Sequence, residues 1–320
     1  MISRLKYKYC TMEPKLSRRT VLAAGSALLA QALPSRAEQA QPEGKLKVAI
    51  FSKHLPFLHG DALPAKVAEL GYDGIDLTVR KGGHVAPERV REDLPPLAAA
   101  IRKHGLDMPL ITTDIVDADT PHAVEILQTM AELGIRRYRW MPPGALKYNP
   151  EQPYPAQLEA LKPRVAKLEA LNRKYNVCAM WHTHSGVAFV GQPIWDLFIL
   201  MRDFDPNRIA VNYDIGHATI EGGVGGWGNS FHVITPHLRG IAVKDFIWAK
   251  DAKGAWKPTW QPLGEGMVKL AEFLKMVKAS GFDGPVQQHF EYPLHTPAET
   301  YAAMRRDLAA LRSALQQADL

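Results

Sequence analysis

The sequence contains too few cysteines for a disulfide framework. Cysteine occurs twice, at Cys10 and Cys178. Cys10 lies in a segment that we predict to be removed on export, so Cys178 has no partner within the mature chain. Cys178 starts an apolar strand pattern, and we therefore expect it to be a small core residue rather than a nucleophile.

A hydrophobic run long enough to span a membrane is also missing from the N-terminal region. The apolar stretch at residues 21–33 is shorter than the roughly 20 residues that a spanning helix needs. It follows basic residues and the twin-arginine pattern Ser17-Arg18-Arg19, and it precedes Ser35-Arg36-Ala37, a small-residue cleavage pattern. We predict a twin-arginine signal peptide at residues 1–37, the twin-arginine export machinery as a partner, and a periplasmic or otherwise exported protein. An uncleaved membrane anchor is the alternative.

The mature chain lacks an excess of positive charge. The formal net charge of the whole chain is +6, but residues 1–37 hold seven basic residues and one acidic residue, Glu13. The remainder is close to neutral and offers no basic patch for a phosphate backbone. We therefore expect no nucleic-acid partner.

No glycine-rich phosphate loop follows the first strand pattern. Ser52-Lys53-His54-Leu55 stands where a doubly wound open sheet would normally have such a loop. Strand patterns alternate with longer helical patterns, such as residues 158–175 and 267–280, which is typical of parallel βα units. The strands are expected at residues 46–52, 74–79, 108–113, 135–141, 177–182, 208–214, 240–245 and 285–291. We predict an α/β fold, a closed (β/α)₈ TIM barrel over residues 38–320 with eight interleaved helices, with the open sheet as the rival.

Polar side chains gather at the expected carboxyl ends of strands, where TIM barrels carry their chemistry. The endings are His182-Thr183-His184 on the fifth strand, Asp214-Ile215-Gly216-His217 on the sixth, Lys244-Asp245 on the seventh and His289-Phe290-Glu291 on the eighth. Side chains alternate along a strand, so residues two apart share a face. Imidazole and carboxylate ligands together suit a divalent metal ion such as Mn²⁺, Zn²⁺, Co²⁺ or Mg²⁺. We predict a bound metal, with a metal-free polar site as the alternative.

Four motifs resemble those of the xylose isomerase-like barrels, a family that includes sugar isomerases, epimerases and inosose dehydratase-like enzymes. They are Gly71-Tyr72-Asp73-Gly74-Ile75-Asp76, Asp214-Ile215-Gly216-His217, Lys244-Asp245 and Pro262-Leu263-Gly264-Glu265-Gly266. Their order around eight strands is more specific than any one of them. The resemblance covers essentially the whole mature chain and implies a TIM barrel that acts on sugars.

The chain departs from the metal-ligand pattern that this resemblance implies. The family uses a Glu, an Asp, a His and a Glu on strands five to eight. Asp214 carries over directly, whereas His182 replaces the first Glu, Ala242 the His and His289 the second Glu. We predict His182, Asp214, His289 and Glu291 as ligands. A depleted site that binds metal weakly or not at all is the alternative.

The chemistry implied by the resemblance is proton movement next to a carbonyl. We predict an enzyme, an isomerase or epimerase of a sugar or keto-sugar, with Glu291 as the base and Lys244 stabilising the enolate oxygen. Alternatively, Lys244 only forms ion pairs with Asp214 or Glu291. Predicted contacts to the carbohydrate substrate come from His217, His184, Arg139, Arg80 and His84, although Arg80 could instead pair with Asp76.

Two other functions remain open at this point. A lyase or dehydratase acting on a 3-keto-glycoside or keto-polyol would use the same parts, and Ala242 favours it modestly. A non-catalytic carbohydrate-binding barrel would use Trp140, Trp181 and Trp248, but we expect Trp140 and Trp181 to pack against helices, on the face opposite the ligands. A related endonuclease activity is disfavoured by export and by the neutral charge.

Overall fold

The computed structural model describes residues 45–320. The predicted signal peptide lies outside these residues. Within them, no helix combines the length and the apolar character that crossing a membrane requires.

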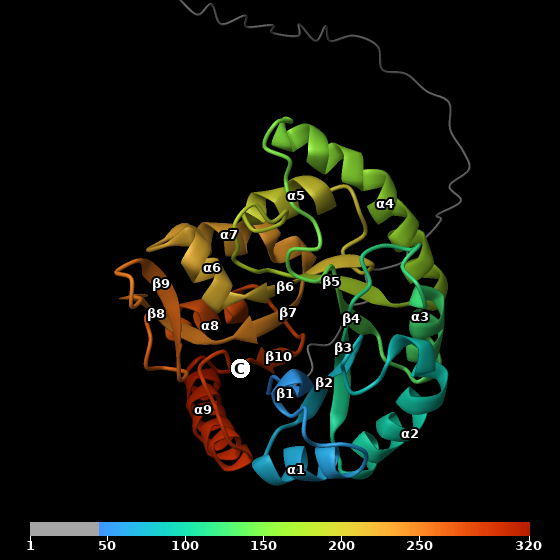
Figure 1. Cartoon of the computed structure of the whole chain (residues 1–320), viewed down its shortest axis with the longest axis vertical. Coiled ribbons are helices and arrows are strands. Elements are labelled where there is room, and N and C mark those ends of the chain that lie inside the picture. The colour runs from blue at the N-terminus through green and yellow to red at the C-terminus, as the bar shows by residue number, and fades with distance from the viewer. Residues whose placement is uncertain (1–44) are drawn as a thin grey trace, which may run out of the picture. The chain divides into compact units, whose positions relative to one another are not determined.

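Eight parallel strands close into a barrel, which confirms the predicted fold. Their order is β1-β10-β7-β6-β5-β4-β3-β2, and Figure 1 looks onto their carboxyl ends. The strands are β1 (Val48–Phe51), β2 (Gly74–Val79), β3 (Asp107–Thr113), β4 (Arg137–Trp140), β5 (Cys178–His182), β6 (Ile209–Asp214), β7 (Leu238–Val243) and β10 (Val286–Gln288). The last strand is shorter than expected, so Glu291 lies beyond it in the following loop.

Helices form the outer ring, as Figure 1 shows. They are α1 (Ala62–Leu70), α2 (Val90–Lys103), α3 (Ala123–Glu132), α4 (Tyr154–Tyr175), α5 (Ile194–Met201), α6 (Ile215–Gly222), α7 (Gly226–Ile234), α8 (Leu270–Ala279) and α9 (Pro297–Gln317). The described part thus has nine α-helices rather than eight, because two of them connect β6 to β7. A Cβ atom on Gly222 would lie 2.3 Å from the backbone nitrogen of Trp227, so the turn between these helices requires glycine there.

An antiparallel hairpin, which the sequence analysis missed, follows β7. It consists of β8 (Asp245–Lys250) and β9 (Trp256–Gln261). After two buried residues, the side chains of β8 alternate between partly buried and exposed, and those of β9 are all exposed or partly buried. The hairpin therefore lacks the continuous apolar run that marks a barrel strand. The hairpin brings Trp260 over the mouth of the barrel.

The interior of the barrel is closed at its lower end by a small apolar layer of Leu110, Cys178, Met180 and Ala210. Cys178 is a buried core residue, as predicted. A larger core lies between the strands and the helices. There Trp140 and Trp181 meet edge to face with ring centroids 5.2 Å apart, alongside α4 and α5. The two tryptophans thus pack against helices, as predicted, rather than line the mouth of the barrel.

The carboxylate of Asp245 anchors the loop before α8. It accepts hydrogen bonds from the backbone N–H groups of Phe246 (2.9 Å), Gly264 (3.0 Å), Gly266 (3.0 Å) and Val268 (3.0 Å). A Cβ atom on Gly266 would lie 2.1 Å from the Asp245 carboxylate. The Lys244-Asp245 and 262–266 motifs are thus two halves of one structural contact.

We expect Asp245→Ala to lower the free energy of unfolding by about 3 kcal/mol, because it strips one buried and three part-buried backbone N–H groups of their acceptor. Urea denaturation measures this change. Asp251→Ala is the control, since Asp251 accepts two backbone bonds in an exposed turn and its loss should change stability little. Equal effects of the two substitutions would contradict the anchoring role.

Candidate functional site

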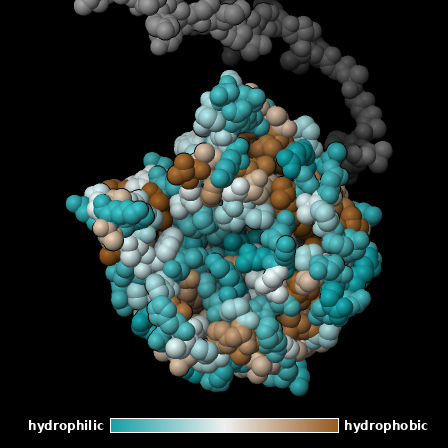
Figure 2. Space-filling model, viewed as in Figure 1, coloured by the Kyte–Doolittle hydropathy of each residue, from teal (hydrophilic) through white to brown (hydrophobic). Residues whose placement is uncertain are grey.

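Three predicted ligands meet at the carboxyl ends of β5, β6 and β10. Oδ2 of Asp214 lies 3.4 Å from Nε2 of His182 and 3.8 Å from Nδ1 of His289, and the three ligand atoms all lie within 4.8 Å of one another. All three side chains are buried. Figure 2 shows a hydrophilic hollow at the centre of the face onto which the strands' carboxyl ends open. Among the described residues, no donor meets Oδ2 of Asp214 with hydrogen-bond geometry, and its charged neighbour is Nζ of Lys244 at 3.2 Å.

Asp214 is held in place by the start of α6. Its Oδ1 accepts the backbone N–H of His217 at 3.0 Å and so caps the helix. Its own backbone N–H donates to Oγ1 of Thr183 at 2.8 Å. A Cβ atom on Gly216 would lie 2.7 Å from Cγ of Lys244. The Asp214-Ile215-Gly216-His217 motif therefore supplies a fixed carboxylate and room for the lysine.

The buried ammonium of Lys244 joins the carboxylates. Nζ lies 3.2 Å from Oδ2 of Asp214, 3.6 Å from Oε1 of Glu291 and 2.7 Å from Nε2 of His217. It also lies 4.6 Å from the ring centroid of Trp260, a cation–π contact. Lys244 thus makes both ion pairs that the sequence analysis considered.

Both ring nitrogens of His217 are engaged. Because the ammonium of Lys244 donates to Nε2, the ring proton is on Nδ1, which donates to Oγ of Ser185 at 2.8 Å. The ring of His184 packs against that of His217 at a tilt of 35°, with ring centroids 3.8 Å apart. Nδ1 of His184 donates to the carbonyl of Ser185 at 2.6 Å, which leaves Nε2 as an acceptor for a substrate hydroxyl.

Glu291 lies apart from the three clustered ligands. Its side chain is 27% exposed, and its Oε1 lies 3.6 Å from Nζ of Lys244 and 3.9 Å from Nζ of Lys53. The geometric cluster of metal-ligating groups comprises His182, Asp214 and His289 without it. The position of Glu291 in the barrel mouth suits a group that meets the substrate.

Arg139 connects a second buried carboxylate to the cluster. Its guanidinium lies 3.6 Å from Oδ2 of Asp76 and 3.4 Å from Nε2 of His289, and it stacks over the ring of Phe51 at 4.8 Å. Burial raises the pKa of Asp76 to about 6, against the opposing effect of Arg139. Asp76 thus pairs with Arg139, whereas the guanidinium of Arg80 lies over Phe51 at 5.7 Å.

His84 joins two loops at the rim. One ring nitrogen lies 2.9 Å from Oγ1 of Thr78 and the other 3.2 Å from the carbonyl of Leu55. Neither nitrogen is left over for a substrate in this arrangement. Substrate contacts from His84, Arg80, Arg139, His184 and His217 stay predictions.

The sequence analysis missed two amides beneath His182. Nδ2 of Asn212 lies 3.0 Å from Nδ1 of His182 and 2.9 Å from Oε1 of Gln287. Oδ1 of Asn212 and Nε2 of Gln287 lack partners in the described part of the chain. If both side-chain amides are rotated by 180°, Oδ1 of Asn212 accepts hydrogen bonds from Nε2 of Gln287 and from Nδ1–H of His182. The lone pair on Nε2 of His182 then faces Asp214. The signal was present: Asn212 stands two residues before Asp214, on the same face.

Burial holds several histidines of the site neutral. Burial, helped by Lys53, Lys244 and Arg139, lowers the pKa of His54 to about 3. Burial likewise places the pKa values of His182, His217 and His289 well below 6.5. Burial opposes ionisation of Asp214, but the charge of Lys244 outweighs it and lowers the pKa of this carboxyl. At neutral pH the site therefore offers uncharged imidazoles beside an ionised carboxylate.

We expect the metal-free protein to lose stability as the pH falls below 6.5. In the unfolded chain these four histidines take up protons near pH 6.5, whereas in the folded protein they stay neutral to lower pH. Each histidine therefore lowers the free energy of unfolding by roughly 1.4 kcal/mol per pH unit between its unfolded and its folded pKa. Asp76, whose folded pKa is raised to about 6, takes up its proton earlier in the folded protein and so adds stability as the pH falls from 6 to 4. This single group does not offset the four histidines. Melting temperatures between pH 7.5 and 5 measure the slope, and His54→Phe should make it shallower. A flat profile would contradict neutral buried histidines.

The cluster can be tested for its fit to a divalent cation. Ligands of a tetrahedral ion at about 2.0–2.2 Å stand roughly 3.4 Å apart. The distances from Oδ2 of Asp214 to the facing nitrogens of His182 and His289 are 3.4 and 3.8 Å. Neutral imidazoles are the form that binds metals. Arg139 favours a proton on Nδ1 of His289, facing Asp214. Asp214 and His182 therefore fit an ion as the stronger ligands. His289 is the weakest, because its Nδ1 can bind a metal only after it gives up its proton.

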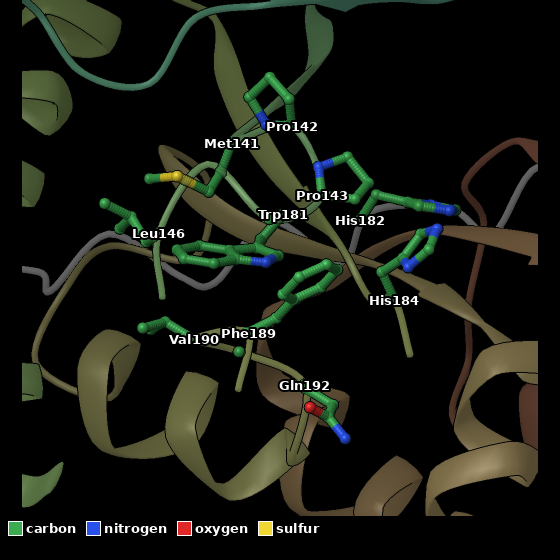
Figure 3. A pocket seen from close by; sticks show the side chains of 12 residues that line it. Met141, Pro142, Pro143, Leu146, Trp181, His182, His184, Phe189, Val190 and Gln192 are labelled. Carbon is green, nitrogen blue, oxygen red and sulfur yellow. The ribbon is translucent and has the colours of Figure 1, made fainter. Parts of the chain in front are cut away.

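A narrow cavity adjoins the site at β4 and β5. Its volume is about 10 Å³, and His182 and His184 line it together with Phe189. Figure 3 shows the ring of Phe189 directed into this space. Cβ atoms on Gly144 and Gly186 would lie 2.9 and 2.3 Å from this ring. The two glycines thus make room for Phe189, which fills this side of the mouth.

The fold and the site together define a class of protein. A closed eight-stranded parallel barrel with its polar cluster at the carboxyl ends of the strands is a TIM-barrel protein. More particularly, the chain belongs to the xylose isomerase-like TIM barrel family, whose sequence model matches residues 64–314. This confirms the resemblance noted in the sequence. No curated protein matches the chain.

Solved structures of sugar epimerases and related proteins share the fold. The apo 3-keto-D-glucoside 4-epimerase YcjR of E. coli is 15% identical, with 84% of this chain and 100% of that chain covered and a TM-score of 0.63. A Mycobacterium smegmatis xylose isomerase-like protein in complex with magnesium is 18% identical, with 84% of this chain and 98% of that chain covered and a TM-score of 0.61. The D-psicose 3-epimerase of Clostridium cellulolyticum H10 with D-tagatose is 10% identical, with 84% of this chain and 99% of that chain covered and a TM-score of 0.59. At these identities the likeness establishes the fold alone.

Proposed function

We propose that this protein is an exported enzyme that moves a proton next to a carbonyl of a sugar or keto-sugar, as an isomerase or epimerase assisted by a divalent metal ion. The observation that carries the proposal is the position of Oδ2 of Asp214. It lies 3.4 and 3.8 Å from ring nitrogens of two neutral histidines and 3.2 Å from Nζ of Lys244, beside Glu291. Family membership and the epimerases among the structural neighbours support an enzyme that acts on small sugars.

The metal ion, held by Asp214, His182 and His289, would polarise the oxygens of the substrate when bound. Glu291 removes the proton from the carbon next to the carbonyl, because its carboxylate lies in the mouth, 3.6 Å from Nζ of Lys244. Lys244 donates a hydrogen bond to the oxygen that gains negative charge. Nε2 of His184 accepts a substrate hydroxyl and orients the ring. Returning the proton to another position or face then gives isomerisation or epimerisation.

We expect elemental analysis of purified protein to find about one divalent metal ion per chain. The double variant Asp214→Ala with His182→Ala should hold none, because it removes the two stronger ligands. His289→Ala should retain part of the metal, because Arg139 competes for this imidazole. Trp195→Ala, an exposed change on α5, is the control and should keep full occupancy. Absence of metal from the unaltered protein, even after dialysis against Mn²⁺, Zn²⁺, Co²⁺ and Mg²⁺, would overturn the metal-assisted mechanism.

A further inference from the structure

The two sides of the barrel mouth differ in the space that they leave for a ligand. On the β4 and β5 side, Phe189 reduces the cavity to about 10 Å³. On the opposite side, where η1 (Ser52–His54) follows β1 and a loop joins β10 to α9, a cavity of about 310 Å³ is open. Of these two sides, only the one at β1 and β10 has room for the part of a substrate that extends beyond a single sugar ring.

This open cavity, which we call the β1–β10 cavity, adjoins the reaction centre. Its lining includes Lys53, His54, Phe57, Phe290, Leu294 and Thr300. Nζ of Lys53 lies 3.9 Å from Oε1 of Glu291, so Lys53 stands where the cavity meets the mouth. An apolar cavity of about 150 Å³ can hold a benzene ring. The β1–β10 cavity therefore has room for an aromatic ring with substituents.

The lining combines apolar side chains with polar ones, and the polar ones are Lys53, His54, Tyr292, His295, Thr296 and Thr300. Phe57, Phe290 and Leu294 supply ring faces and aliphatic surface, and Phe57 is 40% exposed. Nε2 of His54 accepts the backbone N–H of Phe290 at 3.1 Å, so the proton of this neutral ring is on Nδ1 and available to an acceptor. Lys53 supplies an ammonium at the entrance. Such a lining suits an aromatic group that is joined to the sugar through an oxygen.

We propose that the β1–β10 cavity is a subsite for the ring-shaped aglycone of a glycoside, with the glycosidic oxygen beside Lys53. The inference rests on the proposed function in one respect, since it places the sugar ring in the mouth above Asp214. It goes further by naming the substrate class: two-part glycosides with an aromatic aglycone rather than free monosaccharides.

The test measures binding rather than turnover. Calorimetric titration of the Mn²⁺-loaded protein uses phenyl and methyl β-D-glucoside and the matched pair of β-D-galactosides, which lack the keto group and are not converted. We expect the phenyl member of a pair to bind about 30-fold more tightly, because its ring is buried in the cavity. Leu294→Trp, which fills the cavity, and Phe57→Ala, which removes an exposed wall, should each bring the ratio close to one. Trp195→Ala, an exposed aromatic change on α5, should leave the ratio intact.

Each outcome decides the inference. A phenyl preference that falls in a folded cavity variant supports it, and Phe57→Ala serves if Leu294→Trp does not fold. Equal binding of phenyl and methyl glycosides, a preference that survives both cavity variants, or no binding of any glycoside would overturn it. Proton exchange in 3-keto-glucose, which has no aglycone, tests the proposed function separately, so the two can fail independently.

Discussion

Lys244→Met is expected to abolish proton exchange in a keto-sugar while tightening the binding of a divalent metal ion. The ammonium is 3.2 Å from Oδ2 of Asp214, so it competes with a metal ion for this oxygen and repels it. Its removal should lower the dissociation constant for Mn²⁺ at least about tenfold. Loss of the donor to the developing enolate oxygen should reduce the exchange rate by about 10²–10³. Mn²⁺ titration and deuterium uptake by NMR measure the two effects.

Lys53→Met is the matched control for the metal affinity. Lys53 also carries an ammonium near Glu291, at 3.9 Å, but it is half-exposed and has no ion pair with Asp214. We expect a much smaller change in Mn²⁺ affinity from this variant. If Lys244→Met weakened metal binding instead, the lysine would support the ligand geometry rather than compete with the ion. If exchange survived in Lys244→Met, the lysine would have a structural role only.

Glu291→Gln is expected to lower the rate of proton exchange by about 10³ while leaving the metal stoichiometry unchanged. The amide keeps the shape of the side chain but cannot take up the substrate proton. Because Glu291 lies outside the clustered ligands, the ion should stay bound by Asp214, His182 and His289. Deuterium uptake and elemental analysis of the same sample measure both quantities.

Glu132→Gln is the control, since Glu132 is exposed at the end of α3, where it accepts a hydrogen bond from Gln128 at 2.9 Å. Loss of metal from Glu291→Gln would show that Glu291 is the fourth ligand that the sequence suggested. Full activity in Glu291→Gln would assign the base to another group.

The alternation of side chains made most of the central cluster predictable. His182, Asp214 and His289 were placed on inward positions of three expected strands, and the structure brings them together. Ala242 was identified at the position of the family's seventh-strand histidine, and the register pairs it with Asp214 and Gln287. Strand ends in a parallel barrel share one rim, so local patterns suffice to gather these residues.

Contacts that depend on long side chains and on insertions were not predictable in this way. The pairing of Asp76 with Arg139 rather than Arg80 depends on how two long side chains cross the barrel. Trp260 reaches Lys244 through a hairpin whose pattern does not resemble a barrel strand. The filling of one side of the mouth by Phe189 depends on Gly144 and Gly186, which stand far apart in sequence. Periodicity alone carries no information about such contacts.

The most direct test of the central claim is deuterium uptake at the carbon next to the carbonyl of 3-keto-glucose in D₂O. The protein would be compared as purified, after removal of divalent metal by a chelator, and after restoration of Mn²⁺. The account predicts exchange with the metal-loaded protein, its loss on chelation, its recovery with metal, and its absence in Glu291→Gln. Exchange that persists in the metal-free protein, or that is equal in Glu291→Gln, would contradict metal-assisted proton transfer by this site.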